Sequence, residues 1–254
     1  MKLFIKNRKG QRLAVVVEEN ENQKGLVFIM HGLGGFKEQR HIRSFAEAFF
    51  EKGFTVITFD TANALGESGG KIEKACTTSY YEDLEDIINW SKKQNWHQEP
   101  FMLVGSSAGG ICVGLYAESF PEKVKALALI SANVSGKLLW QATPKEILNK
   151  WKKTGWWIQE SDSKPGVFKK LSWANMEDAL KYNLLNKVEN LTMPVLMIAG
   201  EKDVVTSKEH QKILFDKIPG PKEFHIIKSA AHTFRTKEHL AEVKKIFSEW
   251  IDKI

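Results

Sequence analysis

A serine, an aspartate and a histidine stand in this sequence at positions where a nucleophilic site could form. Ser107 is at the centre of Gly-Ser-Ser-Ala-Gly at residues 105–109, after an apolar run and before a helical pattern. A tight strand-to-helix turn of this kind exposes the serine hydroxyl, and its flanking glycines are needed because a Cβ there would collide with neighbouring strands. The pattern predicts that Ser107 is the nucleophile.

Two other serines have to be distinguished from Ser107. Ser68 is also the centre of a Gly-x-Ser-x-Gly match, but a loop separates it from the preceding strand pattern and no strong helical pattern follows it directly. We interpret this stretch as a glycine-rich loop near the site. Ser106 does not fit the pattern, because Val104 stands where the first glycine would have to be.

A serine hydroxyl needs a base to remove its proton, and the base needs an acid that holds it in one tautomer. Asp203 lies in a turn after one predicted strand, and His232 lies in the loop after the next. Because the ligands of open parallel sheets bind at the carboxyl ends of the strands, these side chains should meet at one edge. The chain order predicts a triad of Ser107, Asp203 and His232, with Glu201 as the alternative acid.

The oxyanion that forms when serine attacks a carbonyl needs two backbone donors. His-Gly-Leu-Gly-Gly at residues 31–35 follows the first long apolar run, and its glycines let the backbone turn its N–H groups toward the nucleophile. We predict that Leu33 donates one hydrogen bond and that Ala108 donates the other. A phosphate-binding loop is not favoured, because neither of the common glycine-rich phosphate patterns is present.

Apolar runs of five or six residues alternate with helical patterns, as is typical of buried parallel strands joined by crossover helices. The predicted strands are residues 2–6, 13–17, 26–30, 54–59, 101–104, 124–130, 195–199 and 224–227. The first two are expected to form an antiparallel hairpin at one edge. The fold class is therefore α/β, with a mostly parallel sheet of about eight strands and helices on both faces.

One segment, about residues 134–190, interrupts this alternation because it is much longer than an ordinary crossover. It holds five of the eight tryptophans. We predict a small helical cap on a single domain of residues 1–254. Because the cap leaves the sheet at the edge where the triad meets, its tryptophans are expected to line an apolar pocket for an acyl group. The tryptophans assigned to that pocket are Trp140, Trp151, Trp156 and Trp157.

These motifs resemble those of the α/β-hydrolase superfamily, and within it the serine carboxylesterases and acylglycerol lipases. The matching stretches are HGLGG at residues 31–35, DTANALGES at 60–68, GSSAGG at 105–110, GEKD at 200–203 and AAHTF at 230–234. The resemblance covers nearly the whole chain. It implies the α/β-hydrolase fold and catalysis through an acyl-enzyme without a metal or an organic cofactor.

Composition narrows the class of protein further. With 254 residues, 43% apolar and 27% charged, the chain has ordinary globular composition, which excludes disordered and collagen-like classes. No apolar run approaches 18 residues, so no integral membrane segment is expected, and two cysteines without zinc-like spacing favour a cytoplasmic protein with free thiols. The net charge is +6, and residues 137–170 carry eight lysines against three acids. We interpret these lysines as solvating the cap, with no nucleic-acid partner.

The predicted function is hydrolysis of small-molecule carboxylic esters with short to medium acyl chains. A carboxylate or a cysteine in place of Ser107 would have indicated other chemistries of this fold. The triad does not choose the substrate, so thioesterase, lactonase, C–C bond hydrolase and peptidase activities stay open. A non-catalytic binding protein on the same fold is a further alternative. The sequence does not specify an oligomeric state.

Overall fold

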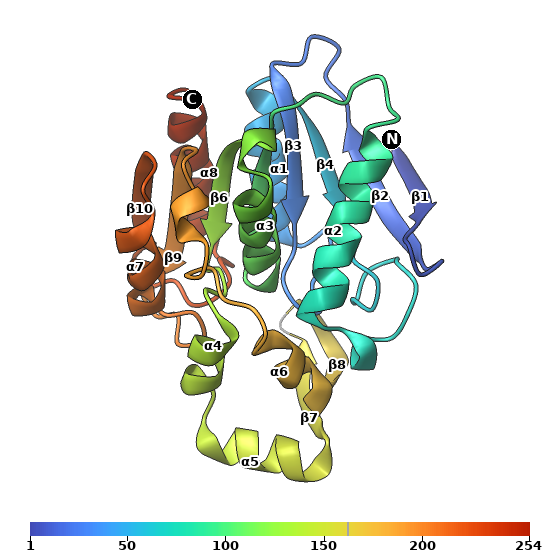
Figure 1. Cartoon of the computed structure of the whole chain (residues 1–254), viewed down its shortest axis with the longest axis vertical. Helices are drawn as coiled ribbons and strands as arrows, with labels where there is room; N and C mark the ends of the chain where they lie inside the picture. The colour runs from blue at the N-terminus through green and yellow to red at the C-terminus, as the bar shows by residue number, and fades with distance from the viewer. Residues whose placement is uncertain (162) are drawn as a thin grey trace.

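The computed structural model describes residues 1–161 and 163–254, and its centre is a sheet of eight strands (Figure 1). The order across the sheet is β1-β2-β4-β3-β5-β6-β9-β10. The strands are β1 (Lys2–Lys6), β2 (Arg12–Glu18), β3 (Gly25–Met30), β4 (Phe54–Phe59), β5 (Phe101–Ser106), β6 (Val124–Ile130), β9 (Val195–Gly200) and β10 (Lys222–Ile227). Only the pairings of β2, with β1 and with β4, are antiparallel within the described sheet. The predicted fold class and the predicted edge hairpin are confirmed.

The central strands are buried on both faces, which explains why they are continuous apolar runs in the sequence. Along β3, Val27 and Ile29 pack in one core cluster, whereas Leu26 and Phe28 pack in the other. Helices cover each face, as Figure 1 shows, with α1 and α8 on one side and α2 and α3 on the other. The helices outside the insertion are α1 (Arg40–Glu51), α2 (Thr77–Ser91), α3 (Ala108–Ser119), α7 (Lys208–Lys217) and α8 (Lys237–Ile251), with short 3₁₀ turns η1 (Ile72–Lys74), η2 (Pro121–Lys123) and η3 (Val188–Asn190).

The insertion after β6 forms a cap at the lower end of the view in Figure 1. Its elements are α4 (Gly136–Ala142), α5 (Lys145–Thr154), β7 (Trp156–Ser161), β8 (Lys164–Ser172) and α6 (Trp173–Ala179). The antiparallel hairpin β7–β8 was not expected in a segment interpreted as helical. It escaped the sequence analysis because its alternating pattern mixes lysines with apolar residues and gives no continuous apolar run.

A small core of its own holds the cap together, and polar contacts fix it to the main domain. Trp151 is almost fully buried between Trp157 and Trp173 and donates its indole N–H to the Leu171 carbonyl oxygen at 3.1 Å. On α6, the Asp178 carboxylate accepts hydrogen bonds from the amide and the hydroxyl of Thr78, at the start of α2. These hydrogen bonds attach the cap to the first turn of α2. Within the described residues, no helix is long and apolar enough to cross a bilayer.

A buried ion pair joins two loops beside the carboxyl ends of β3 and β4. Lys37 is 1% exposed and its ammonium lies 3.0 Å from the Asp60 carboxylate, which is fully buried. The same carboxylate accepts hydrogen bonds from the backbone amides of Lys37 and Glu67, both at 2.7 Å. Asp60 therefore fixes the glycine-rich loop after β4 to the loop that follows β3.

We expect Asp60→Asn to lower the free energy of unfolding by about 1–3 kcal/mol, because it removes a buried charged acceptor, whereas Glu38 and Glu67 still pair with the Lys37 ammonium. Urea denaturation would measure the change. Asp216→Asn is the matched control, since Asp216 pairs with Lys212 on the exposed face of α7. Its cost should stay below about 0.5 kcal/mol. Equal losses in the two variants would contradict the structural role of the buried pair.

Candidate active site

Ser107 occupies the junction between β5 and α3 in a conformation that few side chains tolerate. Its φ is 53° and its ψ is −118°, outside the regions that suit a residue with a Cβ, and such a residue costs about 1–3 kcal/mol. Hydrogen bonds from the neighbouring chain hold it: its amide donates to Ile130 and its carbonyl oxygen accepts from Asn133, both at 3.0 Å. A Cβ on Gly105 would lie 2.5 Å from the Gly109 carbonyl oxygen, so glycine is required there, as predicted.

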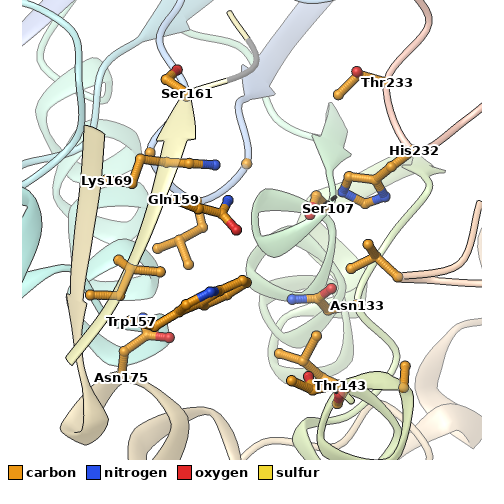
Figure 2. A pocket seen from close by; sticks show the side chains of 18 of the residues that line it. Ser107, Asn133, Thr143, Trp157, Gln159, Ser161, Lys169, Asn175, His232 and Thr233 are labelled. Atoms are coloured by element: carbon orange, nitrogen blue, oxygen red, sulfur yellow. Dashed lines mark hydrogen bonds between the residues drawn. The ribbon is translucent and has the colours of Figure 1, made fainter. Parts of the chain in front are cut away.

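The structure brings the predicted serine, histidine and aspartate into one hydrogen-bonded chain. Figure 2 shows its serine and histidine, with Ser107 beside the His232 ring. His232 Nε2 lies 2.9 Å from Ser107 Oγ, and His232 Nδ1 lies 2.8 Å from Asp203 Oδ2. Asp203 follows β9 and His232 follows β10, and both loops reach the edge at which β5 ends. Because an ionised Asp203 can only accept, Nδ1 carries the proton and Nε2 is left to accept from the serine hydroxyl.

The environment of Asp203 keeps it ionised. Burial opposes the charge, but hydrogen bonding and attraction to His232, together with the donors of Thr206, lower the pKa of Asp203 to about 2. Its Oδ1 accepts from the amides of Val205 and Thr206, both at 2.9 Å. Glu201, the alternative acid, is exposed and instead accepts a hydrogen bond from the Ser229 amide.

Thr206 is a site residue that the sequence analysis missed. Its hydroxyl lies 2.8 Å from Asp203 Oδ2, 3.2 Å from His232 Nδ1 and 2.9 Å from the Ser131 carbonyl oxygen. The hydroxyl thus touches both the acid and the base and ties them to the end of β6. Nothing in the spacing of a single threonine after the acid turn distinguishes this role from that of an ordinary turn residue.

The loop after β3 lies against the nucleophile. A Cβ on Gly32 would approach Ser107 Cβ to 2.9 Å, so only glycine allows the loop to come this close. His31 fixes the loop, because its Nε2 accepts from the Thr61 amide and its Nδ1 then donates to the Gly32 carbonyl oxygen at 2.7 Å. Among the described residues, neither the Leu33 nor the Ala108 amide donates to another protein group. These two amides are therefore available to a ligand at Ser107.

The two competing serines have different surroundings. The Ser68 hydroxyl donates to the Asp60 carbonyl oxygen at 2.6 Å and accepts from the Ala14 amide at 2.8 Å. Ser68 therefore connects β2 to the glycine-rich loop. Ser106 is buried in the last position of β5 and lies beside Ser107 in the wall of the cavity.

A cavity of about 500 Å³, within the usual range for small-molecule sites, opens beside Ser107 and His232. Its cap-side wall is divided. The apolar part is lined by Leu139, Ile147, Trp151, Trp157, Leu171 and Met176, and the polar part by Gln159, Ser161, Ser163 and Lys169. Gln39, which precedes α1 in the main domain, adjoins the polar part through a hydrogen bond to Ser163. In Figure 2, Trp157 lies on one side of the cavity, below Gln159, Lys169 and Ser161. Both an apolar and a polar portion of one ligand can therefore be accommodated.

The structure places two of the four tryptophans assigned to the pocket in the cavity wall and the other two elsewhere in the cap. Trp151 and Trp157 line the cavity. Trp140 and Trp156 are not among its described lining residues. Trp140 packs edge-on against Trp173 in the cap core. Trp156 points to the other face of the hairpin from Trp157, because successive residues of a strand face opposite ways.

The polar lining was also missed, and His41 is its most unusual member. Its side chain is buried in the cavity wall at the start of α1, and burial together with the nearby His232 lowers the pKa of His41 to about 3. It is therefore neutral at physiological pH. In the sequence it is one histidine in an ordinary helical pattern. Among the described residues, no cluster of three or more histidine, cysteine or acidic side chains is arranged to hold a metal ion.

Comparison with known proteins agrees with this architecture. A family model described as the alpha/beta hydrolase fold matches residues 25–164. The chain is 26% identical to the mitochondrial palmitoyl-protein thioesterase ABHD10 of Mus musculus over 239 residues, which cover 91% of this chain and 76% of that protein. It is also 26% identical to an uncharacterized 31.7 kDa protein of Escherichia coli, with 88% of each covered.

Solved structures show the same fold. Est1E from Butyrivibrio proteoclasticus, with ferulic acid bound, superposes with a TM-score of 0.83 at 21% identity, covering 99% of this chain and 98% of that chain. The alpha/beta hydrolase domain-containing protein 10 from mouse gives a TM-score of 0.81 at 22% identity, covering 100% of this chain and 99% of that chain.

We expect Thr206→Val to slow covalent labelling of Ser107 by a fluorophosphonate by about tenfold, because a charged acceptor loses a hydrogen bond. Labelling rates would be read from intact mass, and peptide mass spectrometry would place the adduct. Thr206→Ser keeps the hydroxyl and should label at close to the unmodified rate. Equal slowing by valine and serine would show that Thr206 acts through packing alone.

Proposed function

This chain belongs to the α/β-hydrolase fold family, and we propose that it is a serine hydrolase that cleaves carboxylic esters of short to medium acyl chains. The observation that carries the proposal is the continuous hydrogen-bonded chain from Ser107 through His232 to Asp203. It ends in a carboxylate whose pKa is lowered to about 2, so the imidazole is held in the tautomer that accepts the serine proton.

In the proposed mechanism, Ser107 Oγ attacks the ester carbonyl carbon while His232 Nε2 takes the hydroxyl proton. The carbonyl oxygen becomes an oxyanion that accepts hydrogen bonds from the amides of Leu33 and Ala108. His232 then gives its proton to the alcohol oxygen, the C–O bond breaks, and an acyl-enzyme is left on Ser107. Water deprotonated by His232 attacks this ester, and the carboxylic acid leaves as Ser107 regains its proton.

The cavity has an apolar wall and a polar wall, which supports an ester substrate with an apolar acyl chain and a polar leaving group. The apolar wall formed by Trp151, Trp157, Leu171 and their neighbours suits the acyl chain, and its limited size favours short to medium chains. The polar wall on the hairpin, with Gln159 and Lys169 in opposite positions of β7 and β8, suits a leaving group that forms hydrogen bonds. The neutral His41 adds a further polar contact without placing a second cation near His232.

Thioester hydrolysis is the second candidate, because the mouse relative with 91% coverage of this chain is named a palmitoyl-protein thioesterase. The same acyl-enzyme serves both reactions, and only the leaving atom differs. Matched oxygen and sulfur esters of one acyl group would separate the two functions by kcat/KM. A strong preference for the thioester, after allowing for its intrinsic reactivity, would assign the second function.

We expect Asp203→Asn to lower kcat on a p-nitrophenyl ester by about 10⁴-fold, because a neutral amide favours the wrong imidazole tautomer. Ser107→Ala should lose on the order of 10⁶-fold. Glu201→Gln is the matched control and should stay within about twofold, since Glu201 lies outside the hydrogen-bonded chain. Loss of activity in Glu201→Gln with little change in Asp203→Asn would overturn the assignment of the acid.

The two adjacent tryptophans of β7 test the acyl pocket. Trp157→Ala removes part of the apolar wall and should raise the ratio of kcat/KM for a decanoate over a butyrate p-nitrophenyl ester by about tenfold. Trp156→Ala makes the same chemical change on the opposite face of the strand and should leave the ratio within about twofold. Identical acyl-length profiles in both variants would mean that Trp157 does not bound the acyl chain.

A further inference from the structure

The hairpin β7–β8 has two chemically different faces. Residues paired across an antiparallel hairpin share a face, so Trp157–Leu171 and Gln159–Lys169 look into the cavity. The pairs that alternate with them, Ile158–Lys170 and Glu160–Phe168, belong to the opposite face. We call this opposite face, together with Trp156 and the neighbouring Val167, the outer hairpin face.

The outer hairpin face exposes large apolar side chains close together. Ile158 is 58% exposed, Phe168 60%, Trp156 39% and Val167 38%. Other exposed large apolar residues in the described chain, such as Phe50 on α1, Ile213 on α7 and Ile226 on β10, are spread over different elements. A contiguous apolar patch of this kind is typical of a surface that contacts a partner or a lipid phase.

One lysine lies on this face, and others lie on the helix that precedes the hairpin in the chain. Lys170 lies on the outer face itself, with its ammonium 4.3 Å from the centre of the Trp156 ring. Lys150, Lys152 and Lys153 are exposed on α5, which leads directly into β7. Glu160 is the acidic residue among the paired residues of this face, and its carboxylate accepts a hydrogen bond from the Gly166 amide. Positive charge therefore prevails around the patch, in the segment that holds most of the chain's excess lysines.

We propose that the outer hairpin face docks on the surface of an anionic lipid bilayer. Tryptophan, phenylalanine and isoleucine side chains bury favourably at the level of the lipid headgroups, and lysines beside them are attracted to lipid phosphates. Charge and apolar surface on one face are the two features that such binding needs. The protein lies on the bilayer in this arrangement and does not span it. This inference is independent of the proposed ester hydrolysis.

The composition of the patch favours a bilayer over nucleic acid. Single-stranded nucleic acids use aromatic rings as stacking platforms along a basic groove. Here aliphatic side chains, Ile158 and Val167, form part of the exposed surface, and Trp156 is covered by the Lys170 ammonium on one side. Aliphatic side chains cannot stack on bases as aromatic rings do, but they gain free energy when they insert among lipid chains.

Flotation with vesicles tests the proposal on the full chain. Vesicles of phosphatidylcholine containing about 30 mol% phosphatidylglycerol should bind the protein at least about tenfold more strongly than pure phosphatidylcholine vesicles. High salt should weaken the binding, because it screens exposed charges. Equal binding to both compositions, or none to either, would overturn the proposal.

Substitutions on the outer face identify the surface that binds. Ile158→Ser should lower the partition coefficient by about tenfold, whereas Ile226→Ser, at an exposed position of β10, should leave it unchanged within about twofold. The double variant Lys152→Glu/Lys153→Glu should lower the partition coefficient by at least about tenfold. The double variant Lys217→Glu/Lys245→Glu changes the net charge equally at exposed positions elsewhere and is the control, so it should lower the partition coefficient much less. Thermal melting of every variant checks that it is folded.

Two outcomes of these substitutions would overturn the assignment. If the control variant of Lys217 and Lys245 loses as much vesicle binding as the variant of Lys152 and Lys153, the attraction comes from the net charge of the protein and not from this surface. If light scattering shows that the chain dimerises, that Ile158→Ser abolishes the dimer and that vesicles are not bound, the outer hairpin face is an interface between two copies.

Discussion

The backbone of Ser107 is the constraint on which the site depends. Its positive φ, strained for a residue with a side chain, turns the chain from β5 into α3 and presents the hydroxyl above the sheet. The conformation persists because its surroundings leave no room to relax: the Ser107 amide and carbonyl are both bonded to the chain around the end of β6, and Gly32 lies against its side chain. A parallel sheet is what places these segments at one edge, so the strain at one residue is supported by the whole central sheet.

The charge states of the ionisable groups near Ser107 also depend on how closely these segments pack. The segments that follow β3, β4, β9 and β10 bring ionisable groups to this edge, and each of the buried groups named below has its charge either paired or removed. Asp203 is ionised because donors surround it, and His41 is neutral because burial and the neighbouring His232 oppose its charge. Lys37 and Asp60 are both buried and pair with one another, and the Lys37 ammonium also contacts the carboxylates of Glu38 and Glu67. In the proposed mechanism, His232 is the group of this cluster that transfers the proton between Ser107 and the substrate.

The sequence predicted most of this arrangement because strong local rules governed it. Apolar runs of five or six residues that alternate with helical patterns favour strands buried on both faces, and the predicted limits of β4 and β6 match the structure at both ends. The residues that meet at the sheet edge were found because each follows a strand. Thr206 and His41 were missed because their role depends on which atoms lie beside them after folding, and no spacing rule records that. The hairpin was missed because its exposed face breaks the apolar pattern that identifies a strand.

The same hairpin explains why the tryptophans assigned to the pocket lie in different places. A count of aromatic residues indicates that the cap buries apolar surface, but it carries no information on direction. Direction is set by the two-residue period of a strand, which sends Trp157 into the cavity and Trp156 to the outside, and sends Lys169 and Lys170 apart in the same way. Two adjacent residues of one type therefore have different physical surroundings, one bounding a ligand cavity and one meeting solvent beside a lysine. A single strand pair therefore supplies both a wall of the cavity and a part of the outer surface of the molecule, with one layer of backbone between them.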